Sequence, residues 1–262
     1  MIALQRLDLR LTFFITGEVF DWHPMLVERI ADAGHEIAFH TQHHRVLRNQ
    51  ADLENEICAA AKFISAWRPV GFRAPAMDML AQGYRVLHQA GFAYSSSVYS
   101  SGTAIPVDGL LEIPVSTHPR SGLQCATLIP ARMTLALWQR EIPYGSGYVL
   151  GLRGWRYVHR LVKMREANCL PSNLFIHNWQ LFAFDRRSVN HQYFEALLNP
   201  LHLPYARIVT RDFLGLLSRH RFRRLDAHPA VVARRATHFL VEESSHQAIP
   251  RLSESTSRTM RS

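Results

Sequence analysis

Cysteine is scarce in this sequence. Only three cysteines occur among 262 residues, and no two of them lie close together in the chain. Disulfide frameworks and cysteine zinc clusters both need closely spaced pairs. We therefore expect neither, and we predict that all three thiols are reduced and buried. The three residues are Cys58, Cys125 and Cys169.

Long hydrophobic runs are absent as well. No stretch approaches the ~20 consecutive apolar residues that cross a membrane. The first ten residues, MIALQRLDLR, carry charges where a signal peptide has its apolar run. The sequence as given therefore predicts no transmembrane segment and a cytoplasmic location. Hydrophobic residues still make up 47% of the chain, so a full globular core is possible.

Acidic residues are fewer than basic ones, and much of the excess lies at one end. The formal net charge is +9. Residues 219–262 hold nine arginines against four acids, so this segment carries +5 and the remainder only +4. No zinc finger, recognition helix or aromatic–basic ladder accompanies it. We predict a basic tail that contacts anions without a specific site, and no specific nucleic-acid partner.

Short apolar runs alternate with amphipathic segments in the N-terminal part of the chain. Asp21 is expected to cap the first amphipathic helix, with Pro24 in its first turn and Gly34 at its end. This alternation is typical of parallel βα units. The expected strands span residues 11–15, 35–39, 70–73 and 92–94, and the expected helices span residues 22–33, 51–67 and 80–90.

The later part is less regular, and after residue 218 the pattern dissolves into arginine, serine and threonine. We predict residues 1–218 as one α/β domain and residues 219–262 as a basic tail of low order, with a short helix near residues 231–240. Before the tail we expect strands at 111–115, 173–177 and 206–209, a glycine-marked loop at 145–151, and helices at 155–167, 193–198 and 210–218.

The strongest chemical signal is the run His40-Thr41-Gln42-His43-His44, which follows an expected strand directly. Reactive residues of parallel α/β folds gather where strands end. Two histidines four residues apart can face one metal ion, and neutral imidazole is a good zinc ligand. We predict His40 and His44 as metal ligands. The competing interpretation is a polar loop with solvated histidines.

Two further motifs place polar side chains at strand ends. In GFRAP, an apolar strand delivers Arg73, whose guanidinium can orient a carboxylate, and Pro75 fixes the turn that follows. In FIHNW, an expected strand ends at His177, whose ordinary pKa suits proton transfer, and Trp179 can form an apolar wall for a sugar ring. A surface ion pair and a buried tryptophan are the respective alternatives.

Taken together, the motifs resemble a known family. The run LTFFITGEVFDWHPMLVERIADAGHEIAFHTQHH is very similar to the segment leading into the metal-binding H-(S/T)-x-x-H motif of polysaccharide deacetylases with the NodB homology domain, carbohydrate esterase family 4. GFRAP matches that family's R-x-P motif, and FIH its L-x-H motif with isoleucine for leucine. The run GSGY at 145–148, with the later IHNW, resembles the branch associated with exopolysaccharide gene clusters. The resemblance covers residues 1–218.

The resemblance implies a distorted (β/α)7-type barrel with one divalent metal, most often zinc. It implies that His40 and His44 hold this metal and that His177 is the general acid. Arg73 would orient an aspartate base, and Trp179 and Pro75 would contact the glycan. The metal would activate water and polarise the acetyl carbonyl.

One part of the family pattern is missing. The first motif, a strand ending in a T-F-D-D-type sequence, supplies the base and the aspartate ligand, but this chain contains no Asp-Asp pair. The chain resembles a member truncated at its N-terminus, so we expect the first barrel strand to be absent and the strand at 11–15 to have an unpaired edge. The third metal ligand is not found, because none of four aspartates matches the motif. These are Asp8, Asp21, Asp78 and Asp185.

From these residues we predict metal-dependent hydrolysis of acetyl groups, N-acetyl in preference to O-acetyl, from a polysaccharide or oligosaccharide of cell-surface or exopolysaccharide metabolism. An inactive pseudoenzyme or glycan-binding remnant is the main alternative, because the aspartate motif is missing. Hydrolysis of a small amide and a scaffold acting through the basic tail are the others. The sequence does not determine the oligomeric state.

Overall fold

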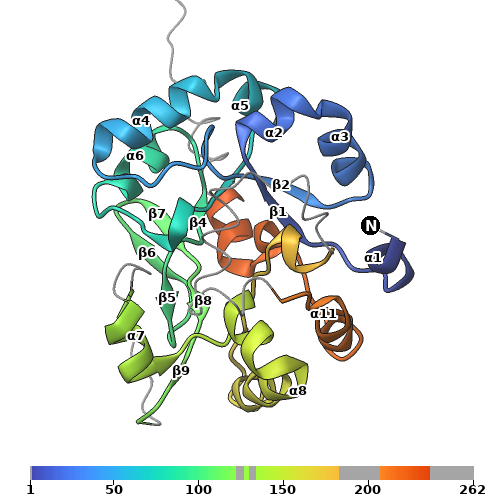
Figure 1. Ribbon diagram of the computed structural model, residues 1–262. Coiled ribbons are helices and arrows are strands. Elements are labelled where there is room, and N and C mark those ends of the chain that lie inside the picture. The colour runs from blue at the N-terminus through green and yellow to red at the C-terminus, as the bar shows by residue number, and fades with distance from the viewer. Residues whose placement is uncertain (1, 122–126, 130–133, 183–206, 237–262) are drawn as a thin grey trace, which may run out of the picture.

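The protein is an α/β structure built on a mixed sheet (Figure 1). The computed structural model describes residues 2–121, 127–129, 134–182 and 207–236. A six-stranded sheet has the order β1-β2-β3-β4-β7-β6. Strands β1, β2, β3, β4 and β7 run parallel to one another, and β6 is antiparallel to β7. Its strands are β1 (Thr12–Ile15), β2 (Glu36–Phe39), β3 (Gly71–Phe72), β4 (Tyr94–Ser95), β7 (Leu110–Glu112) and β6 (Ile105–Val107).

Helices from the N-terminal part cover one face of this sheet (Figure 1). Phe39 of β2 stacks on Phe63 at a ring-centroid separation of 5.7 Å and on Phe92 at 5.9 Å, so this layer is held by aromatic packing. The helices of the N-terminal part are, in chain order, α1 (Ile2–Arg6), α2 (Gly17–Trp22), α3 (Pro24–Asp32), α4 (Gln50–Ala59), α5 (Ala61–Trp67) and α6 (Gly83–Gln89).

The later part adds short strand pairs and a second helical layer. The long helix α8 (Gly147–Glu166) packs against α11 (Thr210–Leu217) around buried Val158, Leu161 and Leu216. No described helix has the length and apolar character needed to cross a membrane. The remaining elements are β5 (Tyr99–Ser100) with β8 (Val115–Ser116), β9 (His118–Pro119) with β10 (Glu141–Ile142), α7 (Thr134–Arg140), and the 3-10 turns η1 (Pro75–Met77), η3 (Asn178–Gln180) and η4 (Leu225–Ala227).

The register of the sheet aligns the carboxyl ends of its parallel strands. Ile15 lies opposite Phe39, and Phe39 opposite Phe72. The hydrogen-bond ladder between strands extends one residue beyond the strand ends. The backbone N–H of His40 donates to Ile15 O at 2.9 Å, and that of Arg73 donates to Phe39 O at 3.0 Å. Polar residues that follow the apolar strands therefore lie together along the carboxyl edge of the sheet, where the parallel strands end.

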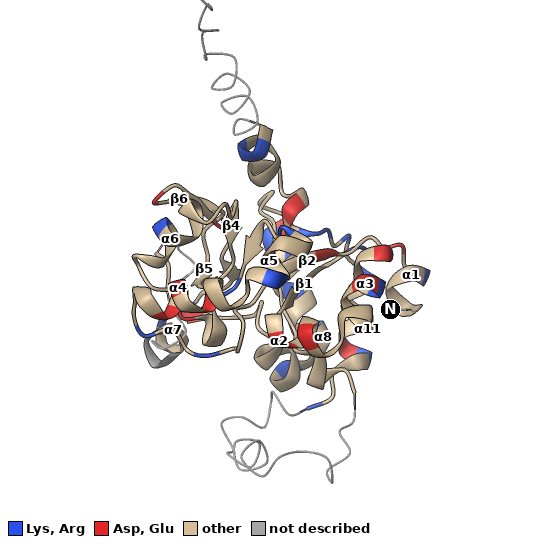
Figure 2. Cartoon of the chain, turned by 90° about the horizontal axis from the view of Figure 1, so that it is seen from above, with Lys and Arg blue, Asp and Glu red and all other residues tan. Residues whose placement is uncertain are grey.

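The predicted α/β class with parallel βα units is confirmed. Within the described residues the sheet is open, with β1 and β6 at its edges. The expected unpaired edge at residues 11–15 is therefore present in β1. Charged residues of both signs occur on several elements around this sheet (Figure 2).

Several local predictions were wrong. The first amphipathic helix is broken at His23 into α2 and α3, and its cap is Thr16, so Asp21 lies inside a helix. The expected loop at 145–151 is helical from Gly147, where Ser146 accepts from the Tyr148 backbone N–H at 3.1 Å. Residues 173–177 form a single bridge between Phe175 and Ser146, not a strand.

The cysteine and C-terminal predictions had mixed outcomes. Cys58 and Cys169 are unpaired, as expected, but exposed, and Cys125 lies outside the described residues, as does the expected helix at 193–198. The strand expected at 206–209 was wrong, because residues 207–209 are described and form no strand. Cysteine burial was inferred from composition alone, which does not place a thiol on a helix face. A short helical stretch is found at residues 229–236, and the domain boundary at 218 stays a prediction.

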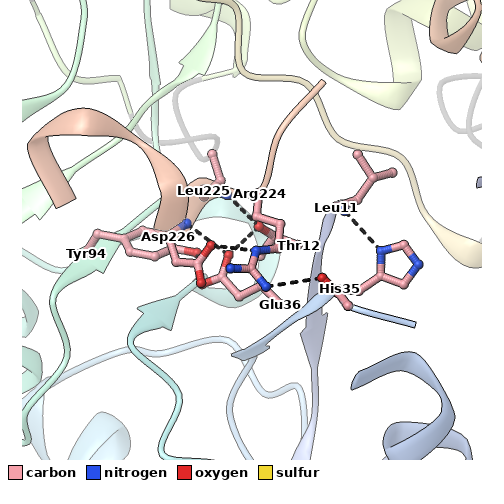
Figure 3. A network of polar contacts seen from close by, with 9 residues as sticks. Leu11, Thr12, His35, Glu36, Tyr94, Arg224, Leu225 and Asp226 are labelled. Carbon is pink, nitrogen blue, oxygen red and sulfur yellow. Dashed lines mark hydrogen bonds and ion pairs between the residues drawn. The ribbon is translucent and has the colours of Figure 1, made fainter. Parts of the chain in front are cut away.

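Residues of the C-terminal segment 224–231 pack against the amino ends of the strands (Figure 3). Glu36 at the start of β2 accepts from the Tyr94 hydroxyl at 2.7 Å and from the Asp226 backbone N–H at 3.1 Å. The Leu225 backbone N–H donates to the Thr12 hydroxyl oxygen at 2.8 Å. Val231 is fully buried in a cluster with Tyr94, Leu111 and Ile113. This segment therefore closes the space at the amino end of the sheet.

Candidate metal and catalytic site

The loop after β2 brings His40 and His44 together. Their ring centroids are 4.6 Å apart with an interplanar angle of 74°. His40 Nδ1 lies 2.8 Å from the carbonyl oxygen of Arg73. Because a carbonyl only accepts, Nδ1 carries the proton and Nε2 keeps its lone pair. An imidazole fixed in this way by a carbonyl oxygen is ready to bind a metal through Nε2.

Both histidines are neutral at physiological pH. Burial, and next the neighbouring imidazole of His44, lower the pKa of His40 to about 3. Burial also lowers the pKa of His44. Metal binding requires the unprotonated ring, so neither imidazole has to lose a proton at pH 7 before it can act as a ligand.

Arg73 is buried next to His40. Its Nε donates to Ser96 O and a terminal nitrogen to Ser96 Oγ, both at 2.7 Å. The guanidinium lies 4.1 Å from the ring centroid of Phe14 and 5.1 Å from that of Phe175. Burial lowers the pKa of Arg73 to about 10, so it remains a cation at neutral pH. Among the described ion pairs none joins Arg73 to a carboxylate, so the aspartate it was expected to orient has no counterpart there.

His177 reaches the same edge of the sheet from the turn that contains η3. Its ring stacks on Trp179 with centroids 4.0 Å apart, and its backbone N–H donates to Gln180 Oε1 at 3.1 Å. Burial, with smaller contributions from the cation of Arg73 and the imidazole of His44, lowers the pKa of His177 to about 4. The structure thus brings His40, His44, Arg73 and His177 together, and their predicted roles as metal ligands, orienting residue and general acid stay predictions.

The two predicted substrate contacts differ in their surroundings. Trp179 is half-buried beside His177, with part of its surface open to solvent. Pro75 is buried at the start of η1, a turn in which Ala76 and Met77 have positive φ angles of 56°. A glycan role for either residue stays a prediction.

The donor set at the site fits a metal only in part. Two neutral imidazoles are present, but no group of three His, Cys, Asp or Glu residues suited to a metal occurs among the described residues. Asp8 is 92% exposed beside Arg10, and Asp21 bonds Gln42 and Lys62. Asp78 is buried after η1, and Asp185 lies outside the described residues. Among the described residues, no third protein ligand accompanies His40 and His44.

The sequence reasoning missed one residue beside the loop. Glu56 of α4 is only 6% exposed, and it accepts hydrogen bonds from the backbone N–H and the ring of His43 at 2.8 and 3.0 Å. Burial acts to raise the pKa of Glu56, but the hydrogen bonds from His43 outweigh it and the pKa is lowered. A signal was available, because Glu56 shares the buried face of α4 with Leu53, three residues earlier.

Known proteins align with the N-terminal part of this chain. The profile of the polysaccharide deacetylase family matches residues 2–95. The chain is 34% identical over 85 residues to a peptidoglycan-N-acetylglucosamine deacetylase of Bacillus cereus, covering 31% of this chain and 40% of that protein. It is 31% identical over 94 residues to the peptidoglycan deacetylase-like protein FGM2 of Gibberella zeae, covering 34% of this chain and 28% of that protein. The chain thus spans less than half the length of these curated relatives.

Part of the chain is also similar to a solved structure. A family 4 carbohydrate esterase from Streptomyces lividans, solved with acetate, is 28% identical over 38% of this chain and 55% of that one, with a TM-score of 0.34. The fold and site define an α/β protein with histidines and an arginine at the carboxyl edge of a parallel sheet. Residues 2–95 therefore carry the chain's similarity to the polysaccharide deacetylase family.

Proposed function

We propose that this protein hydrolyses acetyl groups, N-acetyl in preference to O-acetyl, from a polysaccharide or oligosaccharide of the cell surface or of exopolysaccharide metabolism. The observation that carries the proposal is the convergence of four motif residues, His40, His44, Arg73 and His177, from three separate segments of the chain. The family match and the names of the two peptidoglycan deacetylase relatives support the substrate class.

His40 and His44 would hold a divalent metal, which we propose to be zinc. Such an ion supplies Lewis acidity and an activated water when it is bound. The third protein ligand is absent from the described residues. We therefore expect weak binding, because two neutral imidazoles provide no charge to balance a dication.

His177 would move the proton in this reaction. With a pKa of about 4 it is neutral at pH 7, so it must gain a proton before it donates one. It takes the proton that the attacking water loses and passes it to the leaving nitrogen as the acetyl carbon–nitrogen bond breaks. Trp179, stacked on His177, would present an apolar face to the sugar ring.

Acetate release tests the proposal directly. We expect purified protein with added zinc to release acetate from N-acetylglucosamine oligomers or peptidoglycan glycan strands, and a chelator to abolish the release. His177→Ala should lower the rate by at least tenfold, whereas His23→Ala, at an exposed position before α3, should leave it unchanged. No acetate release by the wild-type protein across these substrates would rule out hydrolysis by this chain.

The missing carboxylate favours a second candidate, a glycan-binding protein without catalysis. This candidate is supported by the observation that no described aspartate or glutamate completes a metal-binding group with His40 and His44. It predicts saturable binding of glycan oligomers that survives His40→Ala and occurs without acetate release. Calorimetric titration with the same oligomers separates the two candidates.

A further inference from the structure

The loop His40 to His44 lies between two helices, and only one of them contacts it through a buried charge. We propose that Glu56 of α4 is a positioning residue that holds His40 and His44 in the geometry needed to share one metal ion. This inference rests on the proposed metal site, and it assigns a role to a residue outside the motifs of the sequence.

The carboxylate of Glu56 contacts three hydrogen-bonding groups on two residues of the loop. One oxygen accepts from the His43 backbone N–H at 2.8 Å, and the other from His43 Nδ1 at 3.0 Å. The Thr41 hydroxyl is a further hydrogen-bond partner of Glu56. Thr41 Oγ1 in turn accepts from the His44 backbone N–H at 3.0 Å. Glu56 is therefore linked through Thr41 to the backbone of His44 itself.

The backbone of the loop explains why such a restraint is needed. Thr41 has a φ of 64° and His44 a φ of 56°, so two non-glycine residues within four positions adopt the left-handed region. This region is unfavourable for residues with a side chain, above all for β-branched threonine. Strained conformations persist only where surrounding contacts determine them, and the bonds to Glu56 lie at this point.

The helix on the other side of the loop makes mainly backbone contacts. The backbone N–H groups of Gly17 and Glu18 donate to Thr41 O and Gln42 O at 3.0 and 3.1 Å. Asp21 accepts from Gln42 at 2.9 Å, but its side chain is 40% exposed. Glu56 is thus the buried carboxylate among the described contacts of the loop, and a buried charge-assisted bond restrains more strongly than an exposed one.

Zinc affinity of the full chain tests the inference, measured by calorimetric titration well below the unfolding temperature. A His40→Ala/His44→Ala variant gives the background from other histidines. We expect Glu56→Gln to weaken zinc binding at the site about tenfold or more, because the loop that carries both ligands loses a charged hydrogen-bond acceptor. Glu54→Gln changes an exposed glutamate on the same helix and should bind as the wild type does.

A second variant separates positioning from charge and does not depend on the folding of Glu56→Gln. Glu56→Asp keeps the charge but is too short to make all the loop contacts, so we expect at least a threefold loss of affinity. Wild-type affinity in Glu56→Asp, or in a folded Glu56→Gln, would overturn the inference. If the wild type binds no more zinc than the His40→Ala/His44→Ala background, the metal site itself is wrong, and the inference falls with it.

Discussion

At the scale of single residues, the chemistry of the site depends on how burial sets the charge of its histidines. The pKa of His40 is lowered to about 3 and that of His177 to about 4, mainly by burial. The neutral form of His177 therefore prevails at pH 7.

The lowered pKa of His177 predicts a dependence of stability on pH. An unfolded histidine binds a proton below about pH 6.5, whereas folded His177 does so only below its pKa of about 4. The free energy of unfolding of the metal-free protein therefore falls as the pH drops from 6.5 toward 4. His177 alone contributes a loss of about 2 kcal/mol at pH 5.

Denaturant unfolding in the presence of a chelator, at pH 7 and at pH 5, measures this effect. In His177→Gln the stability lost between the two pH values should be smaller by about 2 kcal/mol. His23→Gln, at an exposed position, is the control. Equal losses in the wild type and in His177→Gln would show that His177 titrates normally in the folded state.

At the scale of elements, the helix α8 contains a sharp change of direction that its sequence permits. Gly154 has a φ of 74° within this helix. The next residue, Trp155, donates its backbone N–H to Asp212 of α11 at 3.0 Å. The bend therefore exposes a backbone donor that fastens α8 to α11.

Substitution of Gly154 tests the importance of this bend. Gly154→Ala places a side chain in the left-handed region and a Cβ only 3.3 Å from Asp212 Oδ1. We expect a loss of about 1–2 kcal/mol in the free energy of unfolding. Leu152→Ala, at an exposed position of the same helix, should change it by less than about 0.5 kcal/mol. An unchanged free energy of unfolding in Gly154→Ala would mean that the bend at Gly154 is not needed for stability.

The elements that sequence reasoning located well are those with a strong local pattern. The four N-terminal strands were predicted within two residues, because apolar runs bounded by glycine and polar residues are local signals. The break at His23 was missed, although proline at the next position disfavours the helical conformation of His23, and the break at Ala60 has no comparable local signal. The expected strand at 173–177 failed because its apolar residues pack singly against neighbouring segments.

As with the strands and helices, the residues of the candidate site could be predicted where they form part of a local sequence pattern. Residues placed at strand ends, such as His40 and Arg73, could be found because parallel strands end at one edge. Glu56 could not be assigned to the site, because its contact with His43 depends on how α4 packs beside the loop. Its place on an apolar helix face marks it as unusual, but a helical pattern does not say which loop lies opposite.

At the scale of the whole molecule, a segment expected to be disordered supplies part of the core. Val231 is 0% exposed and packs beside Tyr94 and Leu111, whereas the next residue, Val232, is 53% exposed. The basic composition around these residues obscured the signal, because isolated apolar residues do not form a periodic pattern.

The adjacent valines make a matched test of this packing. We expect Val231→Ala to lower the free energy of unfolding by about 1–3 kcal/mol, since it removes two buried methyl groups from a filled space. Val232→Ala should change it by less than about 0.5 kcal/mol. Equal effects of the two substitutions in a denaturant titration would show that residues 224–231 do not pack against the sheet in solution.

The same segment has a consequence for how the chain folds. The bond between Leu225 and Thr12 joins residues 213 positions apart, and that between Arg224 and Gly34 joins residues 190 apart. Contacts between residues so far apart in the sequence form slowly during folding, because the intervening chain must lose conformational entropy before these contacts can stabilise the folded state. During synthesis on the ribosome, the amino ends of the strands therefore stay uncovered until residue 231 has emerged. A nascent chain halted before that point exposes Tyr94, Leu111 and Glu36 to chaperones and proteases.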